Sequence, residues 1–149
     1  MILLNILEEK KILNKIFAKI KTKEPLQEGD VVFGRVVQTT DKIAIVEIES
    51  AENKQKAISP SNNGVLFVNQ ISDEYLEKVG DLLRKGDIIK AEITDADTFG
   101  YKLTINADNY GVIYANCIKC KHPLNLNNNQ TQIKCLNCKQ TQARKIIKV

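Results

Sequence analysis

Alternating apolar and polar positions predict a set of short strands in the middle of the chain. In the second of these segments the apolar side chains from Ala44 to Ile48 recur at every other position and are expected to face a core. In the third, Phe67 is expected to face outward. Turn-forming residues separate the segments. The expected strands cover residues 30–38, 42–49, 64–70, 88–95 and 101–106.

A short helix is predicted between the third and fourth strands. Ser72 can cap its first turn, and Leu76, Val79 and Leu83 would form its buried stripe. Five short strands with one helix between the third and fourth are typical of an OB barrel. The fold class is therefore predicted to be mainly β, with a five-stranded OB barrel at its centre.

Apolar residues at helical spacing also predict an N-terminal helix from Met1 to about Lys21, which ends before Pro25. One amphipathic helix is not stable alone in water, so it is expected to dock on another surface. That surface is the same chain or a second copy, or else a different protein. A membrane surface is the least favoured of these alternatives.

Four cysteines form the most specific motif of the chain. Cys117 and Cys120 make one CxxC pair, Cys135 and Cys138 make another, and fourteen residues separate the pairs. Two such turns supply the four thiolates that a structural zinc ion prefers, so one structural Zn²⁺ is predicted. Disulfides, redox catalysis and a catalytic zinc ion are less favoured alternatives. His122 is expected to be a polar residue of the turn rather than a ligand.

Charge is distributed unevenly along the chain, which has a net charge of +4. Residues 28–106 hold nine basic and fourteen acidic side chains, a net charge of −5, which opposes tight RNA binding by the barrel alone. Weak guidance of a single strand is expected instead, through Phe67, Lys102, Lys90 and Arg35. Residues 107–149 hold seven basic side chains, Arg144 among them, and one acid, a net charge of +6. Most of these basic residues are expected to form a solvated face that can also meet phosphate or an acidic protein.

The chain contains no apolar stretch near the roughly 20 residues that a membrane span requires, and no secretory signal pattern. A cytoplasmic protein without a membrane partner is therefore expected. Three units are predicted, an N-terminal helix with its linker at 1–24, a barrel at 25–109 and a zinc ribbon at 110–149.

Several sequence segments carry a family resemblance over about residues 24–149. The segments GDVVFGRVV, GVLFVNQIS and LLRKGDIIKAEI resemble an S-one-type RNA-binding domain. The same domain followed by YGVIYANCIKC, a second CxxC pair and ARKIIKV resembles the archaeal RNA exosome cap subunit with a C-terminal zinc ribbon (Csl-type). That family usually begins with a small β-rich domain, where this chain has about 25 residues of helical pattern. Many S-one domains also carry aromatic residues where this chain has Lys42 and Ile45.

The resemblance implies a role that is not enzymatic. Cap subunits of this family sit on a ring of RNase PH-type subunits that degrades RNA from its 3′ end, and they form the RNA entry pore. They help to select substrates and, in archaea, link the ring to a DnaG-type protein. The alternative is a stand-alone RNA-binding or transcription-associated zinc-ribbon factor. An enzyme is disfavoured because the chain has one histidine and no phosphate-binding glycine loop after a strand.

Overall fold

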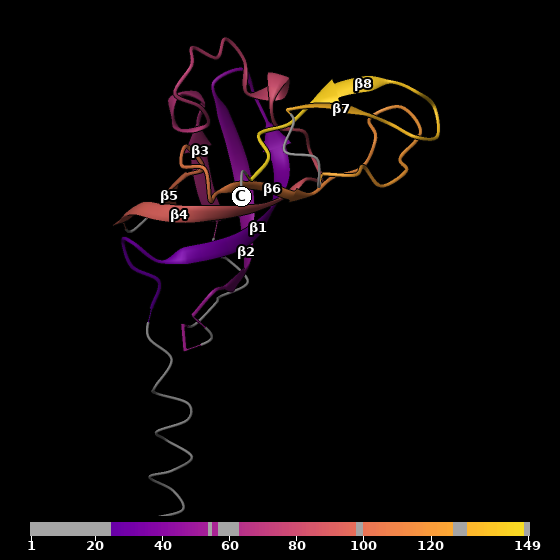
Figure 1. The fold of residues 1–149 in the computed structure, drawn as a ribbon. Helices are drawn as coiled ribbons and strands as arrows, with labels where there is room; N and C mark the ends of the chain where they lie inside the picture. Colours follow the sequence, from indigo (N-terminus) through magenta and orange to yellow (C-terminus); the bar gives the residue numbers. More distant parts are fainter. Residues whose placement is uncertain (1–24, 54, 57–62, 98–99, 127–130, 148–149) are drawn as a thin grey trace, which may run out of the picture.

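A closed β-barrel forms the larger part of the protein (Figure 1). The computed structural model describes residues 25–53, 55–56, 63–97, 100–126 and 131–147; the predicted N-terminal helix lies outside them. No helix in these ranges is long and apolar enough to cross a membrane. The barrel strands are β1 (Val31–Thr39), β2 (Ile43–Ala51), β3 (Asn63–Phe67), β4 (Ile88–Asp97) and β5 (Gly100–Thr104).

Strand pairing closes the barrel and confirms the predicted five-stranded architecture. The order around it is β1-β2-β3-β5-β4, and β4 pairs again with β1. Strands β3 and β5 run parallel, whereas the other pairs are antiparallel. Closure leaves no free edge between β1 and β4, which is how such barrels satisfy their backbone hydrogen bonds.

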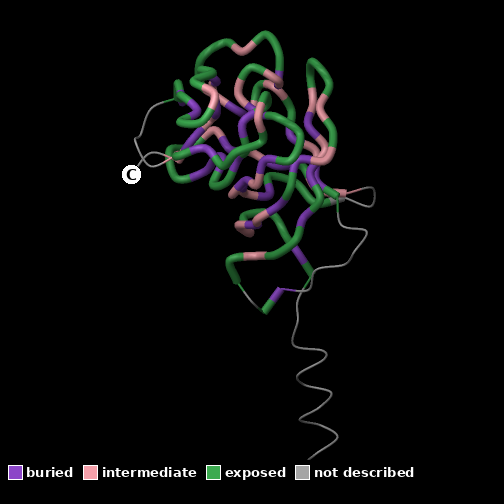
Figure 2. Tube along the Cα trace, turned by 90° about the vertical axis from the view of Figure 1, so that its right-hand side faces the viewer, coloured by how far each residue is buried: buried purple, intermediate pink, exposed green. Residues whose placement is uncertain are grey.

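Buried and exposed positions alternate along the barrel strands, as the sequence pattern predicts (Figure 2). In β2 the side chains of Ala44, Val46 and Ile48 are buried, while Glu47 and Glu49 are exposed. Alternate burial follows from the two-residue period of a strand. The core continues on the other strands through Val32, Val36, Leu66, Ile89, Ala91, Ile93 and Leu103.

The predicted helix between the third and fourth strands is wrong. Residues 71–78 have no regular helix, and two three-residue 3₁₀ helices, η1 (Val68–Gln70) and η2 (Val79–Asp81), flank them. The backbone N–H of Val79 donates instead to the carbonyl of Asp41, at 3.0 Å. A segment this short gains too little from helical hydrogen bonds to nucleate, so its contacts with β1–β2 determine its path. Of the predicted buried stripe, Val79 and Leu83 are buried, whereas Leu76 is half-buried.

A sixth strand that was not expected, β6 (Gly111–Tyr114), extends the barrel sheet beside β4. After the ribbon the chain returns to the barrel, where the N–H of Val112 donates to the carbonyl of Lys145 at 2.6 Å. The N–H of Lys145 in turn donates to the carbonyl of Leu82 at 3.0 Å. Both ends of the ribbon are therefore attached to the barrel.

Gly111 permits this close return of the chain. Its φ is +152°, and a Cβ atom there would lie 2.4 Å from the backbone oxygen of Lys145. Gly111→Ala is therefore expected to lower the free energy of unfolding by about 2 kcal/mol or more, because both the backbone conformation and the contact are strained. Chemical unfolding measures the effect. Gly80→Ala, where the nearest atom is 4.0 Å away, is the control; equal stabilities of the two variants would contradict the prediction.

The ribbon itself is small. Its sheet consists of β7 (Gln132–Lys134) and β8 (Thr141–Ala143), which pair antiparallel, with Ile133 opposite Gln142. An isolated two-stranded sheet is marginally stable in water. The ribbon therefore requires further support, which the cysteines and the junction with the barrel can supply.

Candidate metal centre and nucleic-acid interface

Each CxxC pair is held in a turn of the same geometry. In the first turn, the N–H of Cys117 donates to the carbonyl of His122 at 2.8 Å, and the N–H of Lys121 donates to the carbonyl of Cys117 at 3.0 Å. The second turn, over residues 135–140, repeats both hydrogen bonds at 2.9 Å. Lys121 and Lys139 occupy equivalent left-handed positions, both with φ of 66°. The two turns therefore present their thiols in the same way.

The four cysteine sulfurs converge on one point. Their Sγ atoms all lie within 4.8 Å of one another, and His122 is not part of the group. Two sulfur pairs join the two turns, Cys117 to Cys138 and Cys120 to Cys135, each at 3.5 Å. Four thiolates bound tetrahedrally to zinc lie about 3.8 Å apart, so the arrangement fits that ion. In the part of the chain that the structure describes, no other group of three or more His, Cys, Asp or Glu side chains lies close enough together to hold a metal ion.

Hydrogen bonds and crowding act differently on the thiols of Cys120 and Cys138. The side chain of Asn137 and then the N–H of His122 lower the pKa of Cys120 to about 5. At Cys138 the N–H of Gln140 favours the thiolate, but burial and the neighbouring thiols outweigh it and raise the pKa to about 11. A divalent cation bound here would supply the charge that holds all four groups as thiolates, and four thiolates would leave no ligand position for water.

Behind the cysteines lies a buried polar contact that sequence reasoning missed. The side-chain amide of Gln142 donates from Nε2 to Cys117 Sγ at 2.9 Å. Its Oε1 accepts from the N–H of Ile118 at 3.2 Å and from Nη2 of Arg144 at 3.3 Å. No sequence pattern signals these contacts, because Gln142 stands 25 residues after Cys117.

The prediction that Arg144 belongs to a solvated basic face is wrong. Its side chain is 1% exposed, and its Nε donates to Asp87 Oδ2 of the barrel at 2.8 Å, a carboxylate that is 2% exposed. Burial lowers the pKa of Arg144 and raises that of Asp87, and the charge of each partner opposes these shifts. The guanidinium is buried here because a carboxylate from a distant segment neutralises it.

The outward face of β3 and β5 carries two of the four residues that we expect to meet RNA. Phe67 ends β3 and is 41% exposed. Lys102 on β5 lies opposite Val65, two positions from Phe67 along the same face of β3. Lys102 also lies 3.9 Å from Asp95, in a pair exposed enough for solvent to screen it.

The other two residues lie on the β1–β4 side of the barrel. Lys90 is directly opposite Phe33, and Arg35 follows Phe33 by two residues on β1. Arg35 lies 3.5 Å from the carboxylate of Glu49. The four predicted residues thus form two pairs on different strand pairs rather than one patch.

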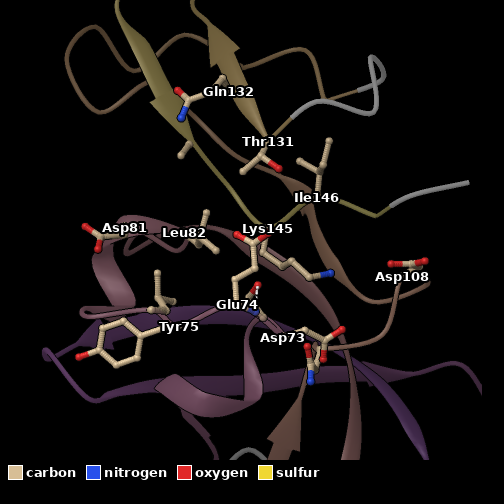
Figure 3. A pocket seen from close by; sticks show the side chains of 14 residues that line it. Asp73, Glu74, Tyr75, Asp81, Leu82, Asp108, Thr131, Gln132, Lys145 and Ile146 are labelled. Carbon is tan, nitrogen blue, oxygen red and sulfur yellow. Dashed lines mark hydrogen bonds between the residues drawn. The ribbon is translucent and has the colours of Figure 1, made fainter.

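A pocket of about 450 Å³ lies between the barrel and the ribbon (Figure 3). Four acidic side chains line it, Asp73, Glu74, Asp81 and Asp108. Lys145 also lines it, but its ammonium group donates to the carbonyls of Ala107 and Tyr110 at 3.2 and 3.0 Å. This negative lining is unfavourable for a nucleic-acid backbone.

Comparison with known proteins gives a consistent family signal. Residues 25–74 match the family model described as exosome component EXOSC1/CSL4. The exosome complex component Csl4 of Archaeoglobus fulgidus is 29% identical over 140 residues, which cover 92% of this chain and 75% of that protein. Because the match covers nearly the whole chain, it includes both the barrel and the cysteine ribbon.

Two further matches cover smaller parts of longer proteins. The 4-hydroxy-3-methylbut-2-enyl diphosphate reductase of Clostridium acetobutylicum is 33% identical over 99 residues, 66% of this chain but 14% of the reductase. A solved structure of an exosome complex RNA-binding protein is 27% identical, with a TM-score of 0.45. It matches 61% of this chain, which spans 49% of that protein. Neither match extends over most of the other protein.

Proposed function

Because the chain belongs to the Csl4-type exosome components, we propose that it is a non-catalytic cap subunit of an archaeal RNA exosome. In this role it forms part of the RNA entry pore and recruits substrates or partner proteins for 3′-to-5′ degradation. We also propose that the chain is divided into three units, an N-terminal segment at 1–24, the barrel at 25–109 and the ribbon at 110–149. The observation that carries the cap-subunit proposal is the 29% identity to an exosome Csl4 protein over 92% of the chain.

Exposed apolar side chains support a role in protein contacts. Six large ones are exposed among the described residues, and four of them lie between residues 113 and 136. Leu136, at the tip of the second cysteine turn, is 75% exposed. Exposed apolar groups beside basic residues favour a protein surface as partner. We assign the surface formed by these four side chains, Ile113, Tyr114, Ile118 and Leu136, to contacts with protein partners, a DnaG-type protein included.

We also propose that the metal is one structural zinc ion. The tetrathiolate set is the combination that structural zinc prefers over harder cations. Such an ion would hold the two cysteine turns together and supply the stability that β7 and β8 lack.

A ring-binding experiment tests the exosome assignment. The purified, metal-loaded chain is expected to bind a reconstituted ring of RNase PH-type subunits with micromolar or tighter affinity, and to degrade no RNA by itself. Isothermal titration calorimetry and a labelled-RNA degradation assay measure the two properties. An unrelated OB-barrel protein serves as the control for nonspecific binding. Absence of binding at micromolar concentrations would overturn the assignment.

For RNA, we propose weak guidance along the barrel rather than tight binding. Phe67 can stack on a base, and Lys102 on the same face can meet a phosphate. Lys90 and Arg35 would contribute on the β1–β4 side. The barrel's net charge of −5 limits attraction of a polyanion from a distance, so assembly with basic partners is expected to be required.

Phe67→Ala is expected to weaken binding of single-stranded RNA by the ring-bound chain about fivefold or more, the loss of one stacked base. Lys102→Ala is expected to reduce the salt dependence of binding by about one counterion. Fluorescence anisotropy over a salt series measures both. Tyr75→Ala removes an aromatic ring that is 89% exposed beside the acidic pocket, and should change nothing. Equal losses for Phe67→Ala and Tyr75→Ala would refute the interface, and a steep salt slope for the isolated chain would favour the stand-alone factor.

A further inference from the structure

A continuous line of buried polar contacts joins the cysteine cluster to the barrel. It runs from Cys117 Sγ to the amide of Gln142 at 2.9 Å, and from that amide to Nη2 of Arg144 at 3.3 Å. The line ends at Asp87, which accepts from Nε of Arg144 at 2.8 Å. Gln142 is 6% exposed, and Arg144 and Asp87 are still more deeply buried. We call these three residues the relay.

The orientation of the Gln142 amide follows from its neighbours. Two donors, the N–H of Ile118 and Nη2 of Arg144, face Oε1. Rotating the amide by half a turn would point its NH₂ group at both donors and its oxygen at the Cys117 sulfur. The two donors need an acceptor that only Oε1 offers, so only the orientation found satisfies every group. The amide therefore requires both Arg144 and the sulfur in place.

Both ends of the relay are anchored. On the ribbon, Arg144 also donates to the carbonyl of Asn116, the residue just before Cys117, at 3.4 Å. On the barrel, Asp87 Oδ2 accepts the N–H of Arg84 at 2.9 Å, and the Asp87 carbonyl accepts the N–H of Val36 on β1 at 2.8 Å. Buried polar groups that lose a partner cost stability, so displacement at one end is unfavourable at the other.

We propose that the relay couples metal binding at the four cysteines to docking of the ribbon on the barrel. Gln142 is a positioning residue that holds Cys117 Sγ toward the other three sulfurs, and Asp87 sets its position through Arg144. Metal binding then strengthens the barrel–ribbon junction, and an intact junction raises metal affinity by the same factor. The proposal rests on the metal site and is independent of the exosome assignment.

Metal affinity of the full chain tests the ribbon end of the relay. Gln142→Met keeps the side-chain length but removes the amide. It is expected to weaken Co²⁺ and Zn²⁺ binding 10- to 100-fold, as loss of a hydrogen bond to a metal ligand typically does. Competition with a chelator, followed by the visible absorption of the Co²⁺ thiolate site, gives the affinity. Gln132→Met, the same change at an exposed position of β7, is the control and should stay within twofold of the unmodified chain.

The barrel end provides the decisive measurement, because Asp87 touches no cysteine. Asp87→Asn is expected to weaken metal binding about tenfold, whereas Asp81→Asn, an exposed acid in η2, should leave it unchanged. In the unmodified chain, metal removal should speed amide exchange at Arg84, whose N–H donates to Asp87. If Asp87→Asn does not fold, the Gln142→Met affinity and the Arg84 exchange decide the question.

Each result has a definite reading. Weaker metal binding by both relay variants, with both controls unchanged, supports the coupling. A metal affinity of Asp87→Asn within twofold of the unmodified chain overturns it while leaving the metal site intact, and so does an unchanged affinity of Gln142→Met. Failure of the unmodified chain to bind either metal overturns both the coupling and the metal site. Loss of ring binding alone concerns only the exosome assignment and does not enter this test.

Discussion

Removing the proposed metal ion with excess chelator is expected to unfold the ribbon between about residues 115 and 143 and to leave the barrel folded. The two ribbon strands have three residues each, and few apolar side chains are buried between them. Structural zinc contributes about 10–16 kcal/mol in comparable small modules, more than such a sheet can replace. Strand β6 should persist, because it pairs with β4 in the barrel sheet.

Amide hydrogen exchange measures this outcome segment by segment. Protection should be lost in residues 131–143 and retained in β1 and β2. After the chelator has been removed, adding back one equivalent of Zn²⁺ should restore it, whereas Mg²⁺, which prefers oxygen ligands, should not. A purified chain with well under one metal ion per molecule, or a ribbon that stays protected in chelator, would contradict the assignment.

Asp87→Asn is expected to lower the free energy of unfolding of the metal-loaded chain by about 3–5 kcal/mol. The substitution leaves the Arg144 guanidinium, 1% exposed, without a neutralising charge in the junction. Arginine does not lose its proton at accessible pH, so it cannot relieve the cost by becoming neutral. Urea unfolding followed by circular dichroism measures the change.

Two companion variants separate charge from packing. The double variant Asp87→Leu with Arg144→Met replaces the pair by apolar groups and should be more stable than Asp87→Asn, because no unpaired charge remains. Asp81→Asn, an exposed acid, should change stability by no more than about 0.5 kcal/mol. An Asp87→Asn variant as stable as Asp81→Asn would contradict the prediction, because the ion pair would then contribute little to the free energy of unfolding.

Much of the barrel follows from local sequence patterns. Alternation in residues 42–49 predicts which face of β2 is buried, because side chains of a strand point to opposite sides in turn. The predicted helix that begins at Ser72 does not form, because a local pattern cannot show which distant groups will bind its backbone. Its apolar spacing is helical, but residues of the turn before β2 supply partners instead, because the Asp41 carbonyl accepts the N–H of Val79 and Lys42 Nζ donates to the carbonyl of Glu77. In such short segments the spacing of apolar residues predicts which side chains are buried more reliably than it predicts the backbone conformation.

The cysteine cluster and the relay differ in how far apart their partners lie in the chain. A CxxC pair is a local turn, so the sequence by itself determined that four thiols would gather in two pairs. The strand alternation likewise determined a barrel with its core residues. Only the tertiary structure decided that Arg144 is buried against Asp87, 57 residues earlier, and that Gln142 contacts Cys117. A charged residue looks solvent-exposed in a sequence, and only folding places its counter-charge and excludes water from the pair.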